Sequence, residues 1–566
     1  MTRAIKRQIL LTATYLLLIS VFLGGGLYLK QNPISWKTWK SGSDAELKTA
    51  YIHYDPTEVN TFDGDPSAGT TGVTLETAIP RFYTTARASV FTFSGIGSVE
   101  ELKGVLKALK ESGSTATFFV TVEDLSQKAD QIHMIRDAGQ SLGISVQPKE
   151  KNSVQQLLAE MNKAAEILRS EYAVREEIFV RQAYGNPSSA MLRASEQGGF
   201  RVLTELKEAV PDSVARMSSA DDAIEAVFNE DEGVLQRGEI VHFQMGLFQY
   251  DDTLLGSLVE KVISEKCVYS VISAAKMAED TESMYSYPVP QNMILQEVKD
   301  KIYPGHLTGK SPEEIFEVIR EGYLGINWVS NRLFLPGFSD AEVECLDHRG
   351  IKDNDGNYVF LTFDDWGTDR TVDELLRVLE KHDATATFFV RTQFVENNPN
   401  LLRAIAEAGH TIGDHSHRHM PLSNEETATS YSELSEVECQ ELEGDLVESY
   451  QTLQKTIGDL RDTDGKPSLS LLFRPPTLAV GRNGLETVFD CGFTHAIAGY
   501  YSTADYKATD AGALMRTLKQ TIRSGAVFVM HFSDNATYTA EAVDMLLTEL
   551  EKNGSEFRFV GLNAVY

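Results

Sequence analysis

Cysteine is scarce in this sequence. The 566 residues contain four cysteines, at positions 267, 345, 439 and 491. They are too few and too widely spaced for the disulfide framework of a small secreted domain, or for a zinc site built from Cys-x-x-Cys pairs. An exported chain permits a disulfide bridge, and buried free thiols are an equally good interpretation. The disulfide-rich and zinc-finger classes are therefore excluded.

Basic residues are also in the minority, with 52 Lys and Arg against 82 Asp and Glu and a net charge of −30 at pH 7. A surface of this sign repels phosphate backbones and anionic lipid headgroups, so we expect no nucleic-acid partner. A hydrophobic content of 42% with 24% charged residues is ordinary for a globular protein. The length predicts about three folded units.

One uncharged apolar run lies near the N-terminus, from Ile9 to Leu29, after Arg3, Lys6 and Arg7. Its length is close to the about 20 residues that cross a bilayer as a helix. The positive-inside rule places the N-terminus in the cytoplasm and the chain after Lys30 outside. A cleaved signal peptide is the alternative. No clean small-x-small cleavage site or lipobox cysteine follows the run, which favours a single-pass signal anchor.

Beyond the anchor, strand-like and helix-like segments alternate, and part of this pattern occurs twice. Residues 90–93 predict a strand, 99–110 an amphipathic helix and 115–120 another strand, an order typical of a parallel sheet or barrel. The hexapeptide 115–120 is identical to 385–390. Further matches follow in the same order: Phe93 with Phe363, Gly143 with Gly413, Arg181 with Arg474, and Gly199-Phe200 with Gly492-Phe493. This order indicates two copies of one α/β domain, with an insertion in the second around residues 433–464.

The predicted organisation has five parts. They are a cytoplasmic tip with a transmembrane anchor (1–30), an extended stalk (31–85), a first domain copy (86–283), an ordered connector (284–345) and a second copy (346–566).

Two adjacent carboxylates, Asp364 and Asp365, follow the apolar strand Phe360–Phe363. In barrel-like α/β folds the C-terminal strand ends gather catalytic groups. Neighbouring residues leaving a strand point in different directions, so the two carboxylates can take different roles. Paired acids at strand ends also cap helices, so the pair alone is a weak signal.

His415 and His419 are four residues apart, which on a helical turn places both imidazoles on one face. With Asp365 as a third ligand, the coordination sphere keeps an open position, as in catalytic divalent metal sites. His417, two positions from either histidine, is expected to face solvent.

These residues together resemble the polysaccharide deacetylases, also called the NodB-homology domain or carbohydrate esterase family four. The resemblance covers about 359–566 and rests on five motifs in the family's order. They are Thr362-Phe363-Asp364-Asp365 with Trp366 in place of Gly; His415-Ser416-His417-Arg418-His419; Arg474-Pro475-Pro476, which departs at Thr477-Leu478; a remnant in Thr503, Asp505 and Tyr506 with Ser502 at the leading Asp; and Met530-His531. The third and fourth motifs are eroded on the substrate-facing side, which leaves the substrate open.

The resemblance implies a tandem of distorted (β/α) barrels and a divalent metal held by Asp365, His415 and His419. Zinc is the expected metal, and cobalt, manganese and nickel also tolerate such mixed nitrogen and oxygen ligands.

The resemblance also implies a catalytic set around this metal. Asp364 would be the general base and His531 the general acid. Arg474 would orient Asp364, and Asp505 would keep His531 protonated. A backbone N–H near Thr477 would help to hold the oxyanion.

The first copy lacks the base and every metal ligand. Ser94, Gly95, Ser145 and Lys149 stand where the second copy has Asp364, Asp365, His415 and His419. At the position of His531, an ungapped alignment places Gln244 and a two-residue gap places His242. We predict a packing partner, with a glycan-binding surface as the alternative; Tyr184 and Phe248 are its aromatic candidates.

The sequence therefore predicts a membrane-anchored, metal-dependent hydrolase that removes N-acetyl groups from an amino-sugar polysaccharide outside the cytoplasm, such as an exopolysaccharide, peptidoglycan or a chitin-like glycan. An O-acetyl esterase on the same centre is a chemical variant. A non-catalytic glycan-binding or assembly protein is the alternative of a different class. The intact base, ligands and acid favour the enzyme, because a binding module has no physical need to keep them.

Overall fold

The computed structural model describes residues 78–147, 153–228, 233–248, 251–325, 335–346, 356–427, 430–499 and 501–566. The anchor and most of the stalk predicted from the sequence lie outside these residues. No helix among the described residues is long and apolar enough to span a bilayer. The last part of the predicted stalk pairs with the first copy, since Ile79 bridges Leu203, Arg81 bridges Glu239, and Phe82 is buried.

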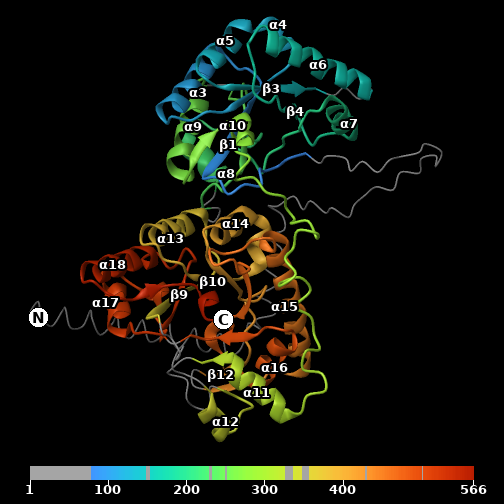
Figure 1. Cartoon of the computed structure of the whole chain (residues 1–566). Coiled ribbons are helices and arrows are strands. Elements are labelled where there is room, and N and C mark those ends of the chain that lie inside the picture. Colours follow the sequence, from blue (N-terminus) through green and yellow to red (C-terminus); the bar gives the residue numbers. More distant parts are fainter. Residues whose placement is uncertain are drawn as a thin grey trace, which may run out of the picture. The chain divides into compact units, whose positions relative to one another are not determined.

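The first copy is built on a seven-stranded, all-parallel sheet with the order β4-β3-β2-β1-β6-β5, in which β7 also pairs with β1 (Figure 1). The predicted strands at 90–93 and 115–120 are β1 and β2, and the predicted helix is α3. The strands are β1 (Ala88–Ser94), β2 (Thr117–Val120), β3 (Ser141–Val146), β4 (Val180–Gln182), β5 (Lys207–Glu208), β6 (Ile240–Gln244) and β7 (Ser270–Ile272). The helices are α3 (Val99–Glu111), α4 (Val122–Gln127), α5 (Ala129–Asp137), α6 (Val154–Ser170), α7 (Ser189–Gly198), α8 (Ala220–Val227), α9 (Leu254–Lys261) and α10 (Ala274–Glu279).

The second copy repeats this design in a nine-stranded sheet with the order β16-β17-β9-β10-β11-β14-β15-β8, in which β18 also pairs with β9. Its strands are β9 (Tyr358–Asp365), β10 (Thr387–Val390), β11 (Thr411–Asp414), β14 (Leu469–Phe473), β15 (His495–Ile497), β16 (Tyr501–Ser502), β17 (Val527–His531), β18 (Arg558–Phe559) and β8 (Tyr323–Leu324). The helices are α13 (Asp369–Lys381), α14 (Pro399–Glu407), α15 (Glu436–Ile457), α16 (Arg482–Asp490), α17 (Ala511–Thr521) and α18 (Thr539–Lys552). A separate antiparallel hairpin joins β12 (Asn424–Thr427) to β13 (Ser430–Ser432).

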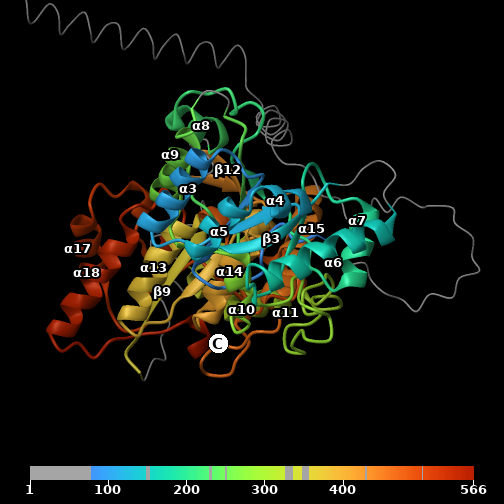
Figure 2. The same ribbon diagram turned by 90° about the horizontal axis from the view of Figure 1, so that it is seen from above.

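The α/β class predicted from the sequence is confirmed, and each predicted barrel is a curled, half-open parallel sheet. In the second copy α13, α17 and α18 lie side by side on one flank of this sheet (Figures 1 and 2).

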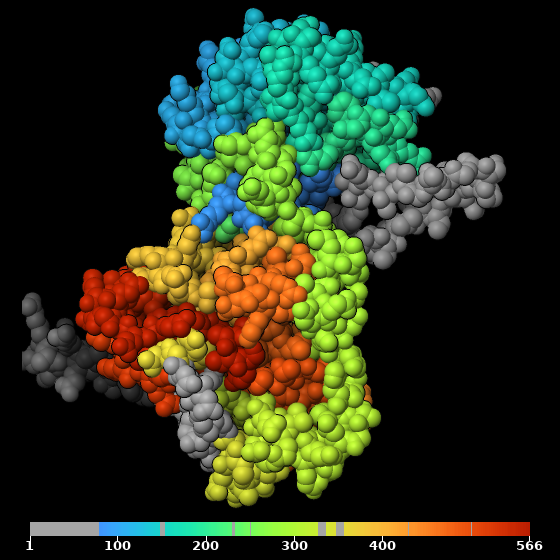
Figure 3. All heavy atoms as spheres, viewed as in Figure 1, coloured from blue at the N-terminus to red at the C-terminus, as the bar shows by residue number. Residues whose placement is uncertain are grey.

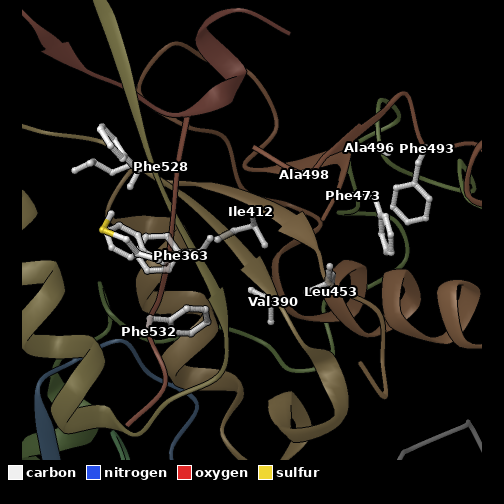
Figure 4. Close-up of a cluster of buried hydrophobic side chains, with 14 of the residues drawn as sticks. Phe363, Val390, Ile412, Leu453, Phe473, Phe493, Ala496, Ala498, Phe528 and Phe532 are labelled. Carbon is white, nitrogen blue, oxygen red and sulfur yellow. The ribbon is translucent and has the colours of Figure 1, made fainter. Parts of the chain in front are cut away.

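Alternation along β9 places its side chains on two faces. Leu361 and Phe363 lie in the large core between sheet and helices, where Figure 4 shows Phe363 near Phe528. Phe360 instead joins a small cluster with Phe389, Leu472, Ile497 and Val527, which all come from strands and line the inside of the curled sheet. Thr362 and Asp364 share the face of Phe360, so the same alternation directs the Asp364 carboxylate inward.

The connector lies along the second copy, where Figure 3 shows its yellow-green spheres beside the orange ones. The amides of Val289 and Leu295 donate to carbonyls at the end of α15, and the Tyr450 hydroxyl donates to the carbonyl of Val298 at 3.2 Å. Two short helices, α11 (Pro312–Gly322) and α12 (Asp340–Cys345), follow, and β8 extends the second sheet. The connector is thus ordered over its described residues.

A buried polar cluster joins the two copies. The Asn400 side chain donates to the carbonyls of Phe82 at 2.8 Å and Arg237 at 2.7 Å, and it accepts from the amide of Thr84. The Arg237 guanidinium is 3.0 Å from the carboxylate of Asp373 on α13, and both side chains are 3% exposed. Asn400 itself is fully buried. These contacts show that the first copy packs against α13 and α14.

The location predicted for the insertion, 433–464, is wrong, because most of that stretch is α15. This helix has a counterpart in the first copy, α6, which also follows the third strand. The buried residues of the two helices have the same spacing: Leu157, Met161, Ala164 and Leu168 in α6, and Leu442, Leu446, Ser449 and Leu453 in α15. Most of the additional residues therefore lie between β11 and α15, in the segment with the histidine motif and the β12–β13 hairpin.

Candidate active site

Asp365, His415 and His419 converge at the C-terminal edge of the second sheet. Asp365 ends β9, and His415 follows β11 directly. Atom Nε2 of His415 is 3.6 Å from Oδ1 of Asp365, and Nε2 of His419 is 3.5 Å from the same oxygen. One potential ligand atom from each residue lies within 4.8 Å of the others, an arrangement that no other His, Cys, Asp and Glu group of the described chain shares.

The predicted helical turn at the two histidines is wrong, because residues 415–419 form an irregular loop. Ser416 has φ 60° and His419 has φ 61°, which is left-handed backbone that non-glycine residues rarely adopt. The Ser416 hydroxyl accepts the amide of Met420 at 2.9 Å and closes the loop. The imidazoles therefore meet because the backbone folds back on itself.

The environment of His415 suits a metal ligand. Its Nδ1 donates to the carbonyl of Arg474 at 2.8 Å, which leaves Nε2 with a lone pair directed towards Asp365. Burial, together with the nearby His419, holds the pKa of His415 well below its usual value, so the imidazole is neutral. Burial also lowers the pKa of His419. Two neutral imidazoles and one carboxylate are a donor set that fits a divalent cation such as zinc.

Asp364 is buried beside Arg474, which is the contact that the resemblance implied. Nη1 of Arg474 donates to both carboxylate oxygens of Asp364 at 2.9 Å, and Nη2 donates to the Thr362 hydroxyl at 2.8 Å. The guanidinium is fully buried and stacks on the ring of Phe389, 4.3 Å from its centroid. Burial raises the pKa of Asp364 to about 6 although the Arg474 charge opposes the shift.

His531 and Asp505 form the second charged pair. Nδ1 of His531 is 2.7 Å from Oδ1 of Asp505, and the His531 amide donates to Oδ2 at 2.8 Å. The hydroxyl of Thr539 also donates to this carboxylate at 2.7 Å. Burial alone would lower the pKa of His531, but the hydrogen bond to Asp505 and the nearby carboxylates, Asp364 first, outweigh it and raise this pKa.

The sequence profile of the family described as "Polysaccharide deacetylase" matches two segments of the chain, residues 84–203 and 351–496. Both copies belong to the polysaccharide deacetylase family. The peptidoglycan-N-acetylglucosamine deacetylase PgdA of Listeria monocytogenes is 30% identical over 199 residues, which are 35% of this chain and 37% of that protein. The peptidoglycan-N-acetylmuramic acid deacetylase PdaA of Bacillus subtilis is 27% identical over 209 residues, 36% of this chain and 69% of that protein. The aligned part thus spans little more than a third of the Listeria relative.

A solved structure of BA3943, a family 4 pseudoenzyme from Bacillus anthracis, aligns with 39% of this chain and 69% of its own at 25% identity and a TM-score of 0.30.

The third histidine of this deacetylase motif, His417, was predicted to face solvent, and that prediction is wrong. Its side chain is 19% exposed, and its Nε2 lies 3.8 Å from a carboxylate oxygen of Glu448. Its Nδ1 is 3.1 Å from the hydroxyl of Thr392. His417 therefore contacts the protein on the side of the loop that faces α15.

The first deacetylase copy shows how the site was lost. β1 pairs with β6 so that Ser94 lies opposite Gln244, just as Asp364 lies opposite His531 in the second copy. The ungapped alignment is therefore right, and Gln244 occupies the place of the acid. Gly95 keeps a positive φ of 71°, but a Cβ there would lie 2.6 Å from Nε2 of Gln244.

The other predicted positions of the first copy agree with a loss of the metal site. Ser145 is buried in β3, and Lys149 lies outside the described residues. Phe248 is 5% exposed and unavailable to a glycan, whereas Tyr184 is 68% exposed. His242 hydrogen bonds through Nδ1 to the Thr92 hydroxyl at 3.0 Å and is a core residue.

The residues that support the histidine loop of this domain, above all Asp445 and Ser449 on α15, are not among those predicted from the sequence. Both are buried, with Asp445 1% and Ser449 0% exposed. The available signal was that they fall on the apolar face of a helix, between Leu442, Leu446 and Leu453.

Proposed function

We propose that this protein is a metal-dependent deacetylase that removes N-acetyl groups from an amino-sugar polysaccharide of the cell envelope, with peptidoglycan as the leading substrate. The observation that carries the proposal is the complete set of groups in the second copy. The buried Asp364 carboxylate and the His531 imidazole, which is bound to Asp505, lie beside the three convergent ligands Asp365, His415 and His419. The Listeria and Bacillus relatives, which are both named as peptidoglycan deacetylases, support this substrate class.

Asp365, His415 and His419 would hold the metal, and zinc suits two imidazole nitrogens and one carboxylate oxygen. When bound there, a divalent cation lowers the pKa of water and polarises the acetyl carbonyl. The remaining steps belong to side chains of this chain.

Asp364 takes the proton from the attacking water as general base. The two bonds from Arg474 fix its orientation, and a pKa of about 6 lets it be ionised and still basic near neutral pH. Because Asp364 is 3% exposed, its carboxylate has little competing contact with bulk water.

His531 gives a proton to the nitrogen of the sugar as the amide C–N bond breaks, which yields acetate and a free amine. Its raised pKa favours the protonated imidazole, and Asp505 fixes Nδ1 so that Nε2 carries the transferable proton. Tyr506, which is 42% exposed, stands edge-on to this ring at 5.1 Å and borders the approach to it.

We further propose that the catalytic copy lies outside the cytoplasm and is held to the membrane by the apolar run Ile9–Leu29. The basic residues before the run support this orientation.

The test is acetate release by the purified full-length protein from N-acetylated peptidoglycan, chitooligosaccharide and an O-acetylated glycan, with and without a chelator. We expect acetate and new amines in equal amounts from an N-acetylated polymer, and their loss with the chelator. Asp510→Asn, at the cap of α17 where Asp510 accepts the amide of Ala513, is the matched control and keeps full activity. If the protein binds a polymer but releases no acetate from any substrate, the deacetylase proposal is wrong and the protein is a glycan-binding protein.

A further inference from the structure

Asp445 on α15 lies directly beneath the loop that carries His415 and His419. Its Oδ1 accepts the amide of His417 at 2.7 Å, and its Oδ2 accepts the amide of Arg418 at 3.2 Å. The Nε of Arg418 donates to the same carboxylate at 2.7 Å. A single buried carboxylate thus holds two consecutive peptide groups in the middle of the histidine motif.

This loop requires an external anchor. Ser416 and His419 both have φ near 60°, a conformation that persists only when the surroundings impose it. The two amides between them have no secondary structure to satisfy them, because the loop is neither helix nor strand. The Asp445 carboxylate supplies their acceptors and so stabilises the backbone that brings the imidazoles together.

Ser449, one helical turn after Asp445 on α15, makes a second contact with the histidine motif. Nδ1 of His417 donates to the Thr392 hydroxyl, Thr392 donates to Ser449 at 2.9 Å, and Ser449 donates to Asp414 at 3.0 Å. Asp414 precedes His415 directly. One face of α15 therefore contacts the motif at its middle and at its start.

The first copy keeps a carboxylate at the position of Asp445 but lacks the metal ligands and the Ser449 hydroxyl. By the shared spacing of buried residues, Glu160 and Ala164 of α6 stand at the positions of Asp445 and Ser449. α6 is preceded by a shorter segment after β3, without a histidine motif. Of the two polar positions on α15, only Ser449 is therefore confined to the copy that keeps the ligands.

We propose that Asp445 is a positioning residue for the metal site, which preorganises His415 and His419 through the backbone of the loop between them. The inference rests on the proposed function, since it assumes that the three convergent side chains bind a metal. Asp445 touches neither ligand side chain, and its effect on metal binding is therefore indirect.

The experiment measures zinc binding by titration calorimetry, and the visible spectrum of the cobalt form, on the full-length protein and its Asp445→Asn and Asp445→Ala variants. Loss of a group that orients metal ligands typically weakens affinity about 10- to 100-fold. We expect such a loss for both variants, larger for Ala than for Asn, which keeps one acceptor oxygen. A changed cobalt spectrum reports the altered ligand geometry.

Asp459→Asn is the matched control. Asp459 binds Arg403 through two hydrogen bonds, at 2.6 and 3.0 Å, just beyond the end of α15, without contact to the histidine loop. It should lose stability but keep the wild-type zinc affinity and cobalt spectrum. Ser449→Ala serves as a second, milder variant should Asp445→Ala not fold.

Two results would overturn the inference: wild-type zinc affinity in Asp445→Asn, or an equal loss in Asp459→Asn. A wild-type protein that binds no zinc or cobalt would instead contradict the proposed function.

Discussion

His531 and Asp364 occupy paired positions on the adjacent parallel strands β17 and β9. The same register in the first copy pairs Gln244 with Ser94. One pair of neighbouring strand ends therefore holds both an acid and a base in the second copy, and two groups without either property in the first. Each of these two side chains is hydrogen bonded to a charged residue that fixes its orientation. Asp505 binds His531, and Arg474 binds Asp364.

Replacing Asp505 should move the pH dependence of the reaction. The hydrogen bond to Asp505, with the charges of Asp364, Asp365 and Asp505, raises the pKa of His531, so the protonated acid persists to higher pH. The rate falls as pH rises through this pKa. In Asp505→Asn the alkaline limb of kcat/KM should therefore move to lower pH, whereas in Asp510→Asn it should stay. An unmoved limb in Asp505→Asn would exclude His531 as the acid that limits the rate.

Removing Arg474 should destabilise the fold as well as the site. Arg474→Met leaves the Asp364 carboxylate buried without its partner, a change that costs about 3–5 kcal/mol in the free energy of unfolding. Urea unfolding measures this loss. Arg320→Met, which breaks the exposed pair with Glu317, is the control and should leave the unfolding midpoint where it is. Equal midpoints for both variants would contradict the buried-pair interpretation.

Asn400→Ala should loosen the contact between the two copies. It leaves the carbonyls of Phe82 and Arg237 and the amide of Thr84 without their partner, and each buried unsatisfied group costs about 1–3 kcal/mol. We expect faster limited proteolysis and a lower unfolding midpoint. Asn553→Ala, at the exposed end of α18, is the control. Unchanged proteolysis in Asn400→Ala would argue against a packing role for the first copy.

Returning the two carboxylates to the first copy should not create a metal site. In a Ser94→Asp, Gly95→Asp variant the new Cβ at 95 meets Gln244 at 2.6 Å, and Ser145 stands in place of a histidine. Zinc analysis should give the same stoichiometry as the wild type. One additional zinc per chain would contradict the interpretation that the first copy cannot hold a metal with these two carboxylates alone.

Several features of the site were predictable because they depend on short-range patterns. The apolar run before Asp364 and Asp365 predicts the strand, and its alternation predicts that the two carboxylates point in different directions. The family motifs then supplied Arg474, Asp505 and His531.

The remaining features depend on tertiary contacts. The i, i+4 spacing of His415 and His419 suggests a helical turn. The chain instead forms an irregular loop, in which two residues have positive φ angles. Asp445 lies on the apolar face of α15, but the helix is rich in acidic residues, and this position alone does not predict what the carboxylate binds. Which acid is buried depends on the loop packed above the helix.

The most direct test of the central claim is acetate release per bound zinc, measured for the wild type and for Asp364→Asn in the same preparations. General bases contribute about 10²- to 10⁴-fold to such rates. We predict that Asp364→Asn binds zinc as the wild type does and loses at least 10²-fold in acetate release, since Arg474 and the three ligands remain. Equal acetate release per zinc in both proteins would contradict the assignment of Asp364 as the base, and absence of release in the wild type on every N-acetylated polymer would contradict the deacetylase itself.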